Sequence, residues 1–326
     1  LNESANFFII MRILYFLCII LTMPRIFALM GSGENSPAMV TPHQNILKKI
    51  GKNSKRINLD TPYGFQENAD ELTEKIRKYF EVNVGFPIED VRLRNPQDKG
   101  VAEISNSDWV FSGPGSPTYA LRVWKATGAD QALRELLNRG SIVMASAAAM
   151  TSGAKVMPVY EMYKVGLDPH WLDGINLLEA ATGIKAAVIA HYNNTQGGTH
   201  DTRFCFIGEN RMRLLEEQLD ADTGILGIDE HTGIAFDLEA GSAEIFGKGQ
   251  VTFKNSIEVS KYSHNFVSKN LNNKIKNQKR RNSSMAETTQ LTSTKEEFRK
   301  HIFTWWDDLN RAREKTLPPS PFTSGN

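Results

Sequence analysis

The chain has 326 residues, of which 40% are hydrophobic and 23% are charged, values that are ordinary for a globular protein and allow a sizeable core. A formal net charge of +1 excludes a strong overall attraction to nucleic acid or to acidic partners. The two cysteines, Cys18 and Cys205, lie far apart and predict no disulfide framework, so a reducing cytoplasm is the expected location. The length fits two domains, or one large domain with tails.

The first 22 residues differ from the rest of the chain. Arg12 precedes the apolar stretch 13–21, a pattern that resembles a signal peptide but is too short to span a bilayer. The first core strand is predicted over 25–31, directly after this stretch. We therefore expect translation to start at Met23 and residues 1–22 to be an upstream extension. The alternative is that residues 11–22 form a signal or anchor, which would make the protein membrane-associated or exported.

From residue 25 onward, predicted strands and helices alternate, as in an α/β protein with an open, mostly parallel sheet flanked by helices. Ligands of such sheets bind beyond the carboxyl ends of the strands. We expect the turns around Gly113 and Ser146, which follow two successive strands, to face one crevice. Strands are predicted over 25–31, 56–60, 108–111, 141–145 and 185–190, and helices over 43–50, 68–80, from 117 onward and over 129–138.

Ser146 stands between two contrasting stretches. The apolar run 142–145 precedes it and three alanines follow, which predicts a buried strand that turns into a helix. A strand-to-helix turn of this kind is where a nucleophile elbow exposes a hydroxyl at the rim of a sheet. The alternative is that Ser146 only caps the following helix.

After a helix over 210–219, three short runs separated by glycines predict an antiparallel β-meander over 233–238, 242–246 and 250–254. The polar segment 229–231 before them is interpreted as a turn, with a place in the crevice as the alternative.

The composition changes beyond residue 254. Residues 270–284 are rich in Asn, Lys and Ser, and residues 255–292 are interpreted as a polar basic linker or tail for which no specific nucleic-acid partner is expected. The alternative is a weak contact with nucleic acid or with an anionic surface. Residues 293–326 are predicted to form an amphipathic helix and a tail. Because a short isolated helix is marginal in water, we expect its face around Trp305 and Trp306 to dock on the main domain or on another chain, as in a homo-oligomer.

Four segments, in this order, resemble class I glutamine amidotransferase-like proteins, and within them the serine-nucleophile branch of dipeptidase E and cyanophycinase. They are 31–34 (Gly-Ser-Gly-Glu), 60–65 (Asp-Thr-Pro-Tyr-Gly-Phe), 112–117 (Ser-Gly-Pro-Gly-Ser-Pro) and the turn at Ser146. The resemblance covers roughly 25–254 and implies a flavodoxin-like, three-layer α/β fold for a domain over 23–254. The elbow of the family usually reads Gly-x-Ser-Ala-Gly-Ala, whereas Met144 and Ala148 occupy the two glycine positions here.

The resemblance implies a Ser-acid-His triad in that chain order. It places the acid at Glu161, 15 residues after Ser146, and the base at His191, which ends an apolar strand and precedes Tyr192. An imidazole is needed because a serine hydroxyl is a poor nucleophile until its proton is removed. His200 in a glycine-rich turn and His170 are rival candidates for the base.

The resemblance also implies an oxyanion hole made by the backbone amides of Gly113 and Ala147, with Gly115 as an alternative donor. Serine hydrolases of this family often bind an acidic residue beside the scissile bond, and the resemblance makes Arg203 and Lys164 candidates to pair with that carboxylate. The alternative is that both are solvated surface charges. The complete set of predicted substrate-binding residues is Gly33, Glu34, Lys164, His200 and Arg203.

The sequence and the resemblance together predict a serine-type hydrolase, a peptidase that cleaves short peptides by acyl transfer. Ordinary glutaminase chemistry is not expected, because serine replaces cysteine. Cyanophycin is not expected as the substrate either, since the segment 193–195 (Asn-Asn-Thr) lacks the basic motif of cyanophycinases. No cofactor is expected, and no metal, because no metal-ligand spacing is recognisable. The alternative is a non-catalytic relative that binds a small molecule or oligomerises.

Overall fold

The computed structural model describes residues 24–255 and 259–263. The expectations for residues 1–22 and for the helix around Trp305 and Trp306 lie outside the described residues, as does most of the linker predicted over 255–292. Within the described part, no helix has the length and apolar character needed to cross a bilayer.

The main sheet has seven strands in the order β11-β10-β1-β5-β4-β2-β3. The five strands from β1 to β3 in that order pair in parallel, whereas β10 and β11 are antiparallel. A large, mostly parallel sheet confirms the predicted fold class. The strand bounds are β1 (Ile26–Met30), β2 (Arg56–Leu59), β3 (Glu89–Val91), β4 (Trp109–Ser112), β5 (Ser141–Ala145), β10 (Thr232–Asp237) and β11 (Ser242–Gly247).

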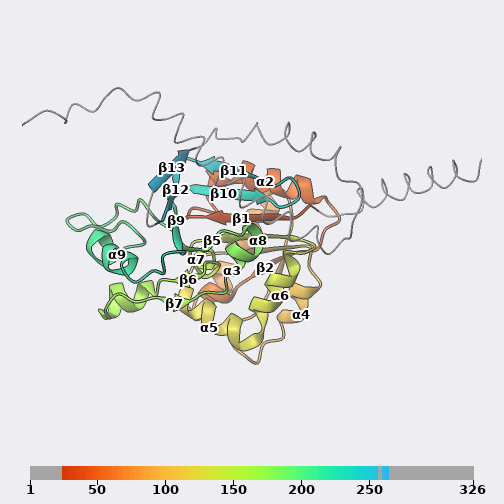
Figure 1. Ribbon diagram of the computed structural model, residues 1–326. Helices are drawn as coiled ribbons and strands as arrows, with labels where there is room; N and C mark the ends of the chain where they lie inside the picture. Colours follow the sequence, from red (N-terminus) through yellow and green to blue (C-terminus); the bar gives the residue numbers. More distant parts are fainter. Residues whose placement is uncertain (1–23, 256–258, 264–326) are drawn as a thin grey trace, which may run out of the picture.

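Helices cover both faces of this sheet, which makes the fold three-layered (Figure 1). One face packs on α2 (Pro37–Ile50), α3 (Ala69–Lys78) and the wide helical turn η2 (Tyr79–Val84). The other face packs on α4 (Val101–Ser105), α5 (Pro117–Thr127), α6 (Ala129–Leu136), α7 (Ala147–Thr151) and α8 (Leu177–Thr182).

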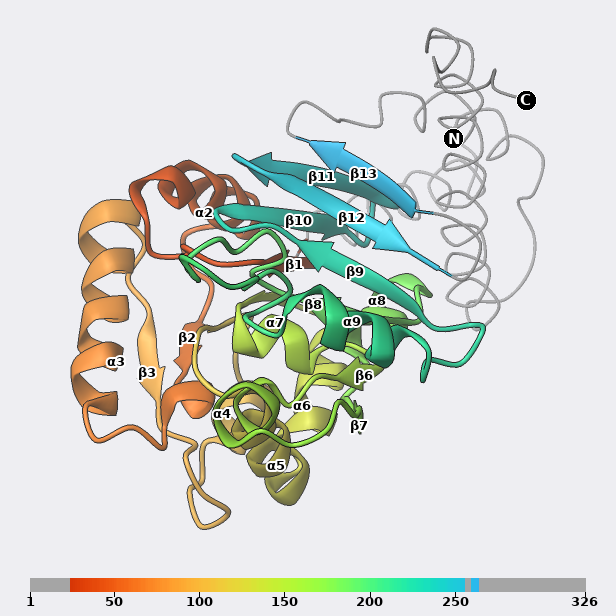
Figure 2. The same cartoon turned by 90° about the vertical axis from the view of Figure 1, so that its left-hand side faces the viewer.

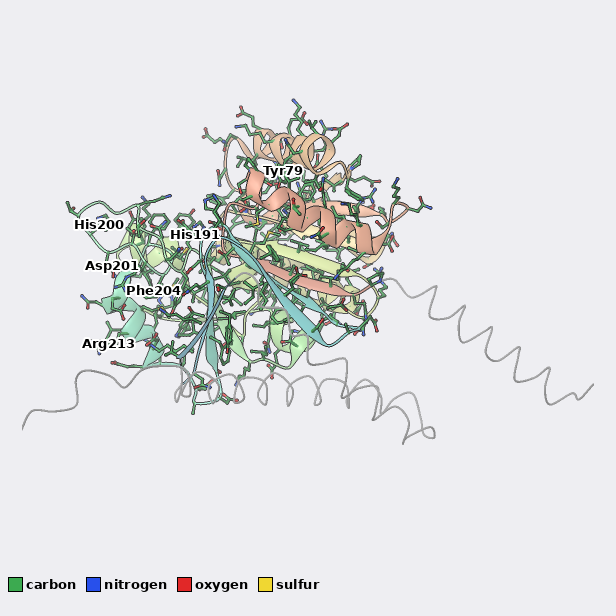
Figure 3. The ribbon with its side chains drawn as sticks, turned by 90° about the horizontal axis from the view of Figure 1, so that it is seen from above. Tyr79, His191, His200, Asp201, Phe204 and Arg213 are labelled. Carbon is green, nitrogen blue, oxygen red and sulfur yellow. The ribbon has the colours of Figure 1, made fainter. Side chains whose placement is uncertain are left out.

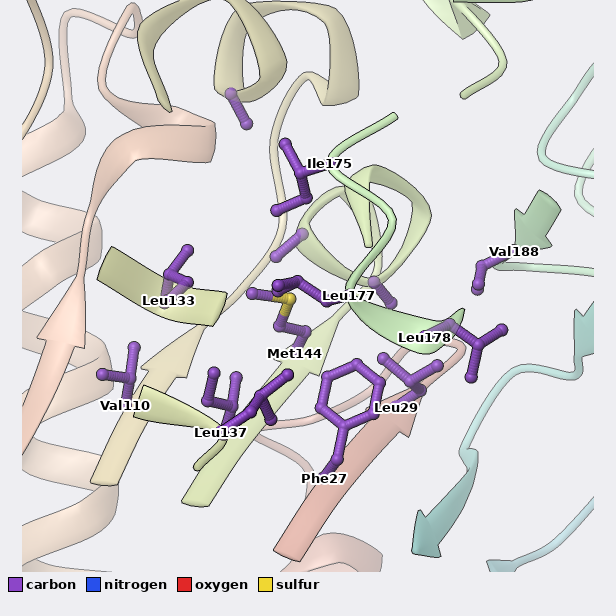
Figure 4. Packing of buried hydrophobic residues seen from close by; sticks show 14 of the residues in the cluster. Phe27, Leu29, Val110, Leu133, Leu137, Met144, Ile175, Leu177, Leu178 and Val188 are labelled. Carbon is purple, nitrogen blue, oxygen red and sulfur yellow. The ribbon is translucent and has the colours of Figure 1, made fainter. Parts of the chain in front are cut away.

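Alternation along β1 explains the two cores. Ala28 and Met30 of β1 point to one core, whereas Phe27 and Leu29 point to the other, because successive side chains of a strand face opposite ways. Figure 4 shows Phe27 and Leu29 packed in the second core.

A second sheet of four strands has the order β13-β12-β9-β8. Figure 2 shows it beside the edge of the main sheet that carries β10 and β11. Its strands are β8 (Ala186–Ile189), β9 (Gly224–Ile228), β12 (Gln250–Lys254) and β13 (Val259–Ser263), and the remaining elements are η1 (Thr61–Tyr63), β6 (Lys155–Val156), η3 (Glu161–Val165), β7 (Leu172–Asp173) and α9 (Gly208–Glu216).

The predicted β-meander is wrong in its last strand. β10 and β11 form the expected hairpin, but β12 pairs with β9 and β13 instead of β11. Burial explains this choice, because pairing with β9 places Val251 against Leu226 and Ile228 in the core. Two other predictions differ at the ends of helices. α2 begins at Pro37 instead of residue 43, since proline at the first helical position loses no hydrogen bond, and α3 ends at Lys78 before η2.

Candidate active site

Ser146 lies at the carboxyl end of β5, where the strand turns into α7. Its backbone has φ 50° and ψ −116°, a conformation that residues with a side chain rarely adopt. The Ser146 amide donates a hydrogen bond to the carbonyl oxygen of Met30 at the end of β1, at 2.9 Å. The turn is therefore tied to the neighbouring parallel strand, and its conformation is imposed by the sheet around it.

His191 and Glu230 follow two strands of the second sheet. His191 lies between Ser146 and Glu230 and contacts both. His191 and Glu230 follow β8 and β9, which pair in parallel with Ile189 opposite Gly227, so that both residues emerge at the same edge. The Nε2 atom of His191 lies 3.0 Å from the Ser146 Oγ, and its Nδ1 atom lies 2.9 Å from a carboxylate oxygen of Glu230.

These contacts define the proton positions. An ionised carboxylate only accepts hydrogen bonds, so the Nδ1 atom of His191 carries the proton and donates it to Glu230. The Nε2 atom is then free to accept the hydroxyl proton of Ser146. This is the arrangement that a serine nucleophile requires of its base.

Backbone and side-chain hydrogen bonds hold His191 and Glu230 in place. The His191 amide donates to the carbonyl of Gly31 at 3.3 Å, and the His191 carbonyl accepts from the amide of Cys205 at 3.2 Å. The Glu230 carboxylate also accepts from the Asn194 side chain at 2.9 Å. Because both partners are fixed independently of the serine, the row of hydrogen bonds is built in advance of any ligand.

Glu230 is ionised in this setting. Burial disfavours its charged form, but the hydrogen bonds from His191 and Asn194 outweigh that effect and hold the pKa of Glu230 below its ordinary value. The side chains of His191 and Glu230 are each 22% exposed, so the pair is only partly screened by water.

The structure corrects the expected partner of His191. Glu161 lies in η3, where its carboxylate accepts a hydrogen bond from the Thr118 hydroxyl at 3.1 Å, and Glu230 pairs with the imidazole instead. The chain order is thus Ser-His-acid. The sequence does contain a signal, since Glu230 follows an apolar strand just as His191 does, but a short polar segment between two strands is equally typical of a turn.

The rival histidines do not contact the serine. His200 is exposed on an outer loop, which Figure 3 shows apart from His191. His170 contacts the carbonyl of Asp168 through Nδ1 at 2.9 Å.

A pocket of about 250 Å³ opens beside Ser146. Of the predicted substrate-binding residues, Lys164 lines this pocket, whereas Gly33, Glu34, His200 and Arg203 are not part of its lining.

Arg203 and Glu34 lie outside the lining of the pocket. Arg203 forms ion pairs with Asp201 at 2.8 Å and with Glu209 at 3.1 Å. Glu34 is only 6% exposed. It lies next to Gly113, and a Cβ added to Gly113 would be 3.8 Å from the Glu34 carboxylate oxygen. Burial raises the pKa of Glu34, and this outweighs a hydrogen bond from its own backbone amide and the charges of His191 and His231.

Three backbone amides near Ser146 have no acceptor among residues 24–255 and 259–263: those of Gly113, Gly115 and Ala147. Ala147 and Gly115 line the pocket, whereas Gly113 does not. The carbonyl of Gly113 accepts from the Ala148 amide at 3.2 Å, which fixes this loop beside α7.

The two departures from the family turn fit the fold. Met144 is fully buried and packs with Leu133 and Leu177 in the core shown in Figure 4, on the side of the sheet that has room for a long side chain. Ala148 is also fully buried, in α7. Neither side chain prevents Ser146 from adopting its positive φ.

No group of three His, Cys, Asp or Glu side chains in the described ranges is placed to hold a metal ion.

A parallel α/β sheet with a serine, a histidine and a carboxylate in one hydrogen-bonded row defines the class of α/β serine hydrolases. The comparison with protein families identifies the family: the model of peptidase family S51 matches residues 27–243, more than half of the chain. The chain belongs to peptidase family S51 and is a serine peptidase. A comparison with curated proteins finds no match.

The fold resembles that of a solved peptidase structure. A peptidase from an acI-B1 Actinobacterium is 18% identical, with a TM-score of 0.59 over 75% of this chain and 96% of its own. A peptidase E-like protein from Listeria monocytogenes EGD-e is 17% identical, with a TM-score of 0.46 over 74% of this chain and 98% of its own.

Proposed function

We propose that Ser146, His191 and Glu230 form the catalytic triad of a peptidase that cleaves short peptides by acyl transfer. The observation that carries this proposal is the continuous row of hydrogen bonds from the Ser146 hydroxyl through His191 to Glu230, at 3.0 and 2.9 Å. The backbone turn at Ser146 supports it, because a nucleophile elbow has the same strand-turn-helix setting.

The atoms present support the following steps. The Ser146 Oγ attacks the carbonyl carbon of the scissile bond while His191 Nε2 removes the hydroxyl proton. The resulting imidazolium is stabilised by the carboxylate of Glu230 and then protonates the leaving amine. A water molecule, deprotonated by the same nitrogen, then attacks the carbonyl carbon of the acyl-enzyme. The bond from this carbon to the Ser146 Oγ breaks, the product acid leaves, and His191 returns the proton to the Oγ.

The developing negative charge on the substrate oxygen requires donors. The Ala147 amide is the first candidate, because it follows the nucleophile at the start of α7 and is unpaired within the described chain. Gly113 is the second proposed donor, with Gly115 as the alternative since it lines the pocket. Pro114, which lies between them, has no amide hydrogen.

The size of the pocket supports a short substrate. Its volume of about 250 Å³ lies below the roughly 300–1,000 Å³ of sites that enclose drug-sized molecules. It therefore suits one side chain together with the atoms around the scissile bond.

Labelling with a fluorophosphonate tests the proposal directly. We expect an adduct on Ser146 in the full chain, with loss of labelling in Ser146→Ala and in His191→Ala. His200→Ala is the matched control, because this exposed histidine has no place in the triad, and it should label normally. An unlabelled Ser146 in folded protein would instead support the alternative of a non-catalytic binding relative.

A further inference from the structure

We propose that Asn194 is a positioning residue of this site, which holds the carboxylate of Glu230 in place for His191 and keeps that carboxylate ionised. The inference rests on the proposed function, because it concerns the acid of the triad. Asn194 does not line the pocket beside Ser146, so it acts on the reaction through Glu230 and not through the substrate.

The side chain of Asn194 contacts the same carboxylate oxygen as the imidazole. Its Nδ2 atom donates a hydrogen bond to the Oε1 atom of Glu230 at 2.9 Å, and the Nδ1 atom of His191 donates to that oxygen at 2.9 Å as well. A hydrogen bond to an ionised acceptor is about twice as strong as one between neutral groups. Two such donors on one oxygen fix the direction in which the carboxylate points.

Backbone contacts fix which way the side-chain amide of Asn194 faces. Its Oδ1 atom accepts from the backbone amide of Gln196 at 3.1 Å, and a backbone N–H can only donate, so the Nδ2 atom faces Glu230. The backbone amide of Asn194 donates to the His191 carbonyl at 3.1 Å, and its own carbonyl accepts from the Thr202 hydroxyl at 3.3 Å. The donor is therefore held in place by contacts that do not involve Glu230.

The neighbouring Asn193 holds the main chain of the same glutamate. Its Oδ1 atom accepts from the backbone amide of Glu230 at 2.8 Å. The two asparagines differ in burial, since Asn194 is 1% exposed and Asn193 is exposed. Because water competes less for a buried donor, we expect the bond from Asn194 to have the larger effect.

The ionised state of Glu230 depends on this contact. Burial raises the pKa of Glu230, and the hydrogen bonds from His191 and Asn194 together bring the pKa below its ordinary value. Three further titratable groups interact with this charge: His231, Asp229 and Cys205. Without the donor of Asn194, the effect of burial is opposed less strongly, so Glu230 takes up a proton at a higher pH.

The pH dependence of fluorophosphonate labelling at Ser146 tests the inference. The measured quantity is the second-order rate constant of labelling from acidic to neutral pH. In Asn194→Ala the rate at neutral pH should fall about 10- to 100-fold, as expected for the loss of one hydrogen bond to a charged group. The acidic limb of the profile should move to higher pH, because His191 and Glu230 titrate as a coupled pair.

A second variant and a matched control separate this role from a purely structural one. Asn194→Ser keeps the local turn, because a serine hydroxyl can also accept from the Gln196 amide, but it is too short to reach Glu230. It should shift the acidic limb as Asn194→Ala does, with a smaller loss in Tm. The control is Asn58→Ala, since Asn58 is fully buried and donates to the carboxylate of Asp90 at 3.2 Å, two strands from β5 in the main sheet. It should lower Tm, keep the labelling rate within about threefold and leave the acidic limb in place.

A double variant tests whether Asn194 acts through the charge of Glu230. In the Glu230→Gln background, adding Asn194→Ala should slow labelling by less than about threefold, because the hydrogen bond to an uncharged oxygen is weaker. Equal slowing in both backgrounds would overturn the inference, because Asn194 would then act on something other than the carboxylate.

The remaining outcomes distinguish this inference from the proposed function. If Ser146 of the wild type reacts but the acidic limb stays in place in the folded Asn194 variants, the inference is overturned and the proposed function survives. A folded wild-type protein whose Ser146 does not react overturns the proposed function, and this inference with it.

Discussion

Replacing the carboxylate that contacts His191 tests the site most sharply. In Glu230→Gln the amide oxygen remains able to accept from His191 and Asn194, so the geometry can persist while the negative charge is lost. Charges about 4 Å apart at an effective dielectric constant of about 20 interact by about 4 kcal/mol. Since about 1.4 kcal/mol corresponds to a tenfold change in rate, kcat should fall roughly a thousandfold.

Glu161→Gln is the matched control for this change. Glu161 contacts Thr118 through a hydrogen bond that glutamine can also accept, so kcat should stay within about threefold of the wild type, the range of a surface substitution. The assay is initial-rate hydrolysis of a short peptide substrate, with circular dichroism to verify folding. The reasoning is refuted if Glu230→Gln keeps a tenth of the activity, or if Glu161→Gln loses as much as Glu230→Gln.

Three further predictions concern the free energy of unfolding. Ser146→Gly should be about 1 kcal/mol more stable than Ser146→Ala, a rise in Tm of about 2–4 °C, because φ 50° strains a residue with a side chain; equal Tm values in calorimetry would contradict this. Gly115→Ala should lower the free energy of unfolding, measured in urea, by at least about 2 kcal/mol, because its Cβ would lie 2.0 Å from the Pro62 carbonyl oxygen. Gly128→Ala, at φ 78° with open space around the added Cβ, should lower it by about 1 kcal/mol. Similar losses of stability in the two variants would refute the steric explanation. Burial lowers the pKa of His43 from 6.5 to about 4. The stability that its neutral form contributes is therefore present above pH 6.5, and about 3 kcal/mol of the free energy of unfolding is lost as the pH falls to 4. His43→Leu should remove that part of the pH dependence, and an unchanged dependence would be evidence against this assignment.

The sequence predicted those features that depend on local patterns. The apolar run before Ser146 and the alanines after it were enough to predict a strand that turns into a helix, since neither signal depends on distant residues. The apolar strand before His191 likewise placed this histidine at a strand end. The resemblance added the family, which the family match confirms.

Only the tertiary structure decided which carboxylate meets His191. Glu161 and Glu230 are both acidic residues downstream of Ser146, and spacing along the chain does not distinguish them. Pairing of β8 with β9 brings Glu230 to the imidazole, whereas η3 carries Glu161 to Thr118. Strand pairing depends on which distant apolar faces are buried together, and the same cause moved β12 out of the predicted meander. Local sequence therefore determined the elements of this protein, and long-range burial determined their partners.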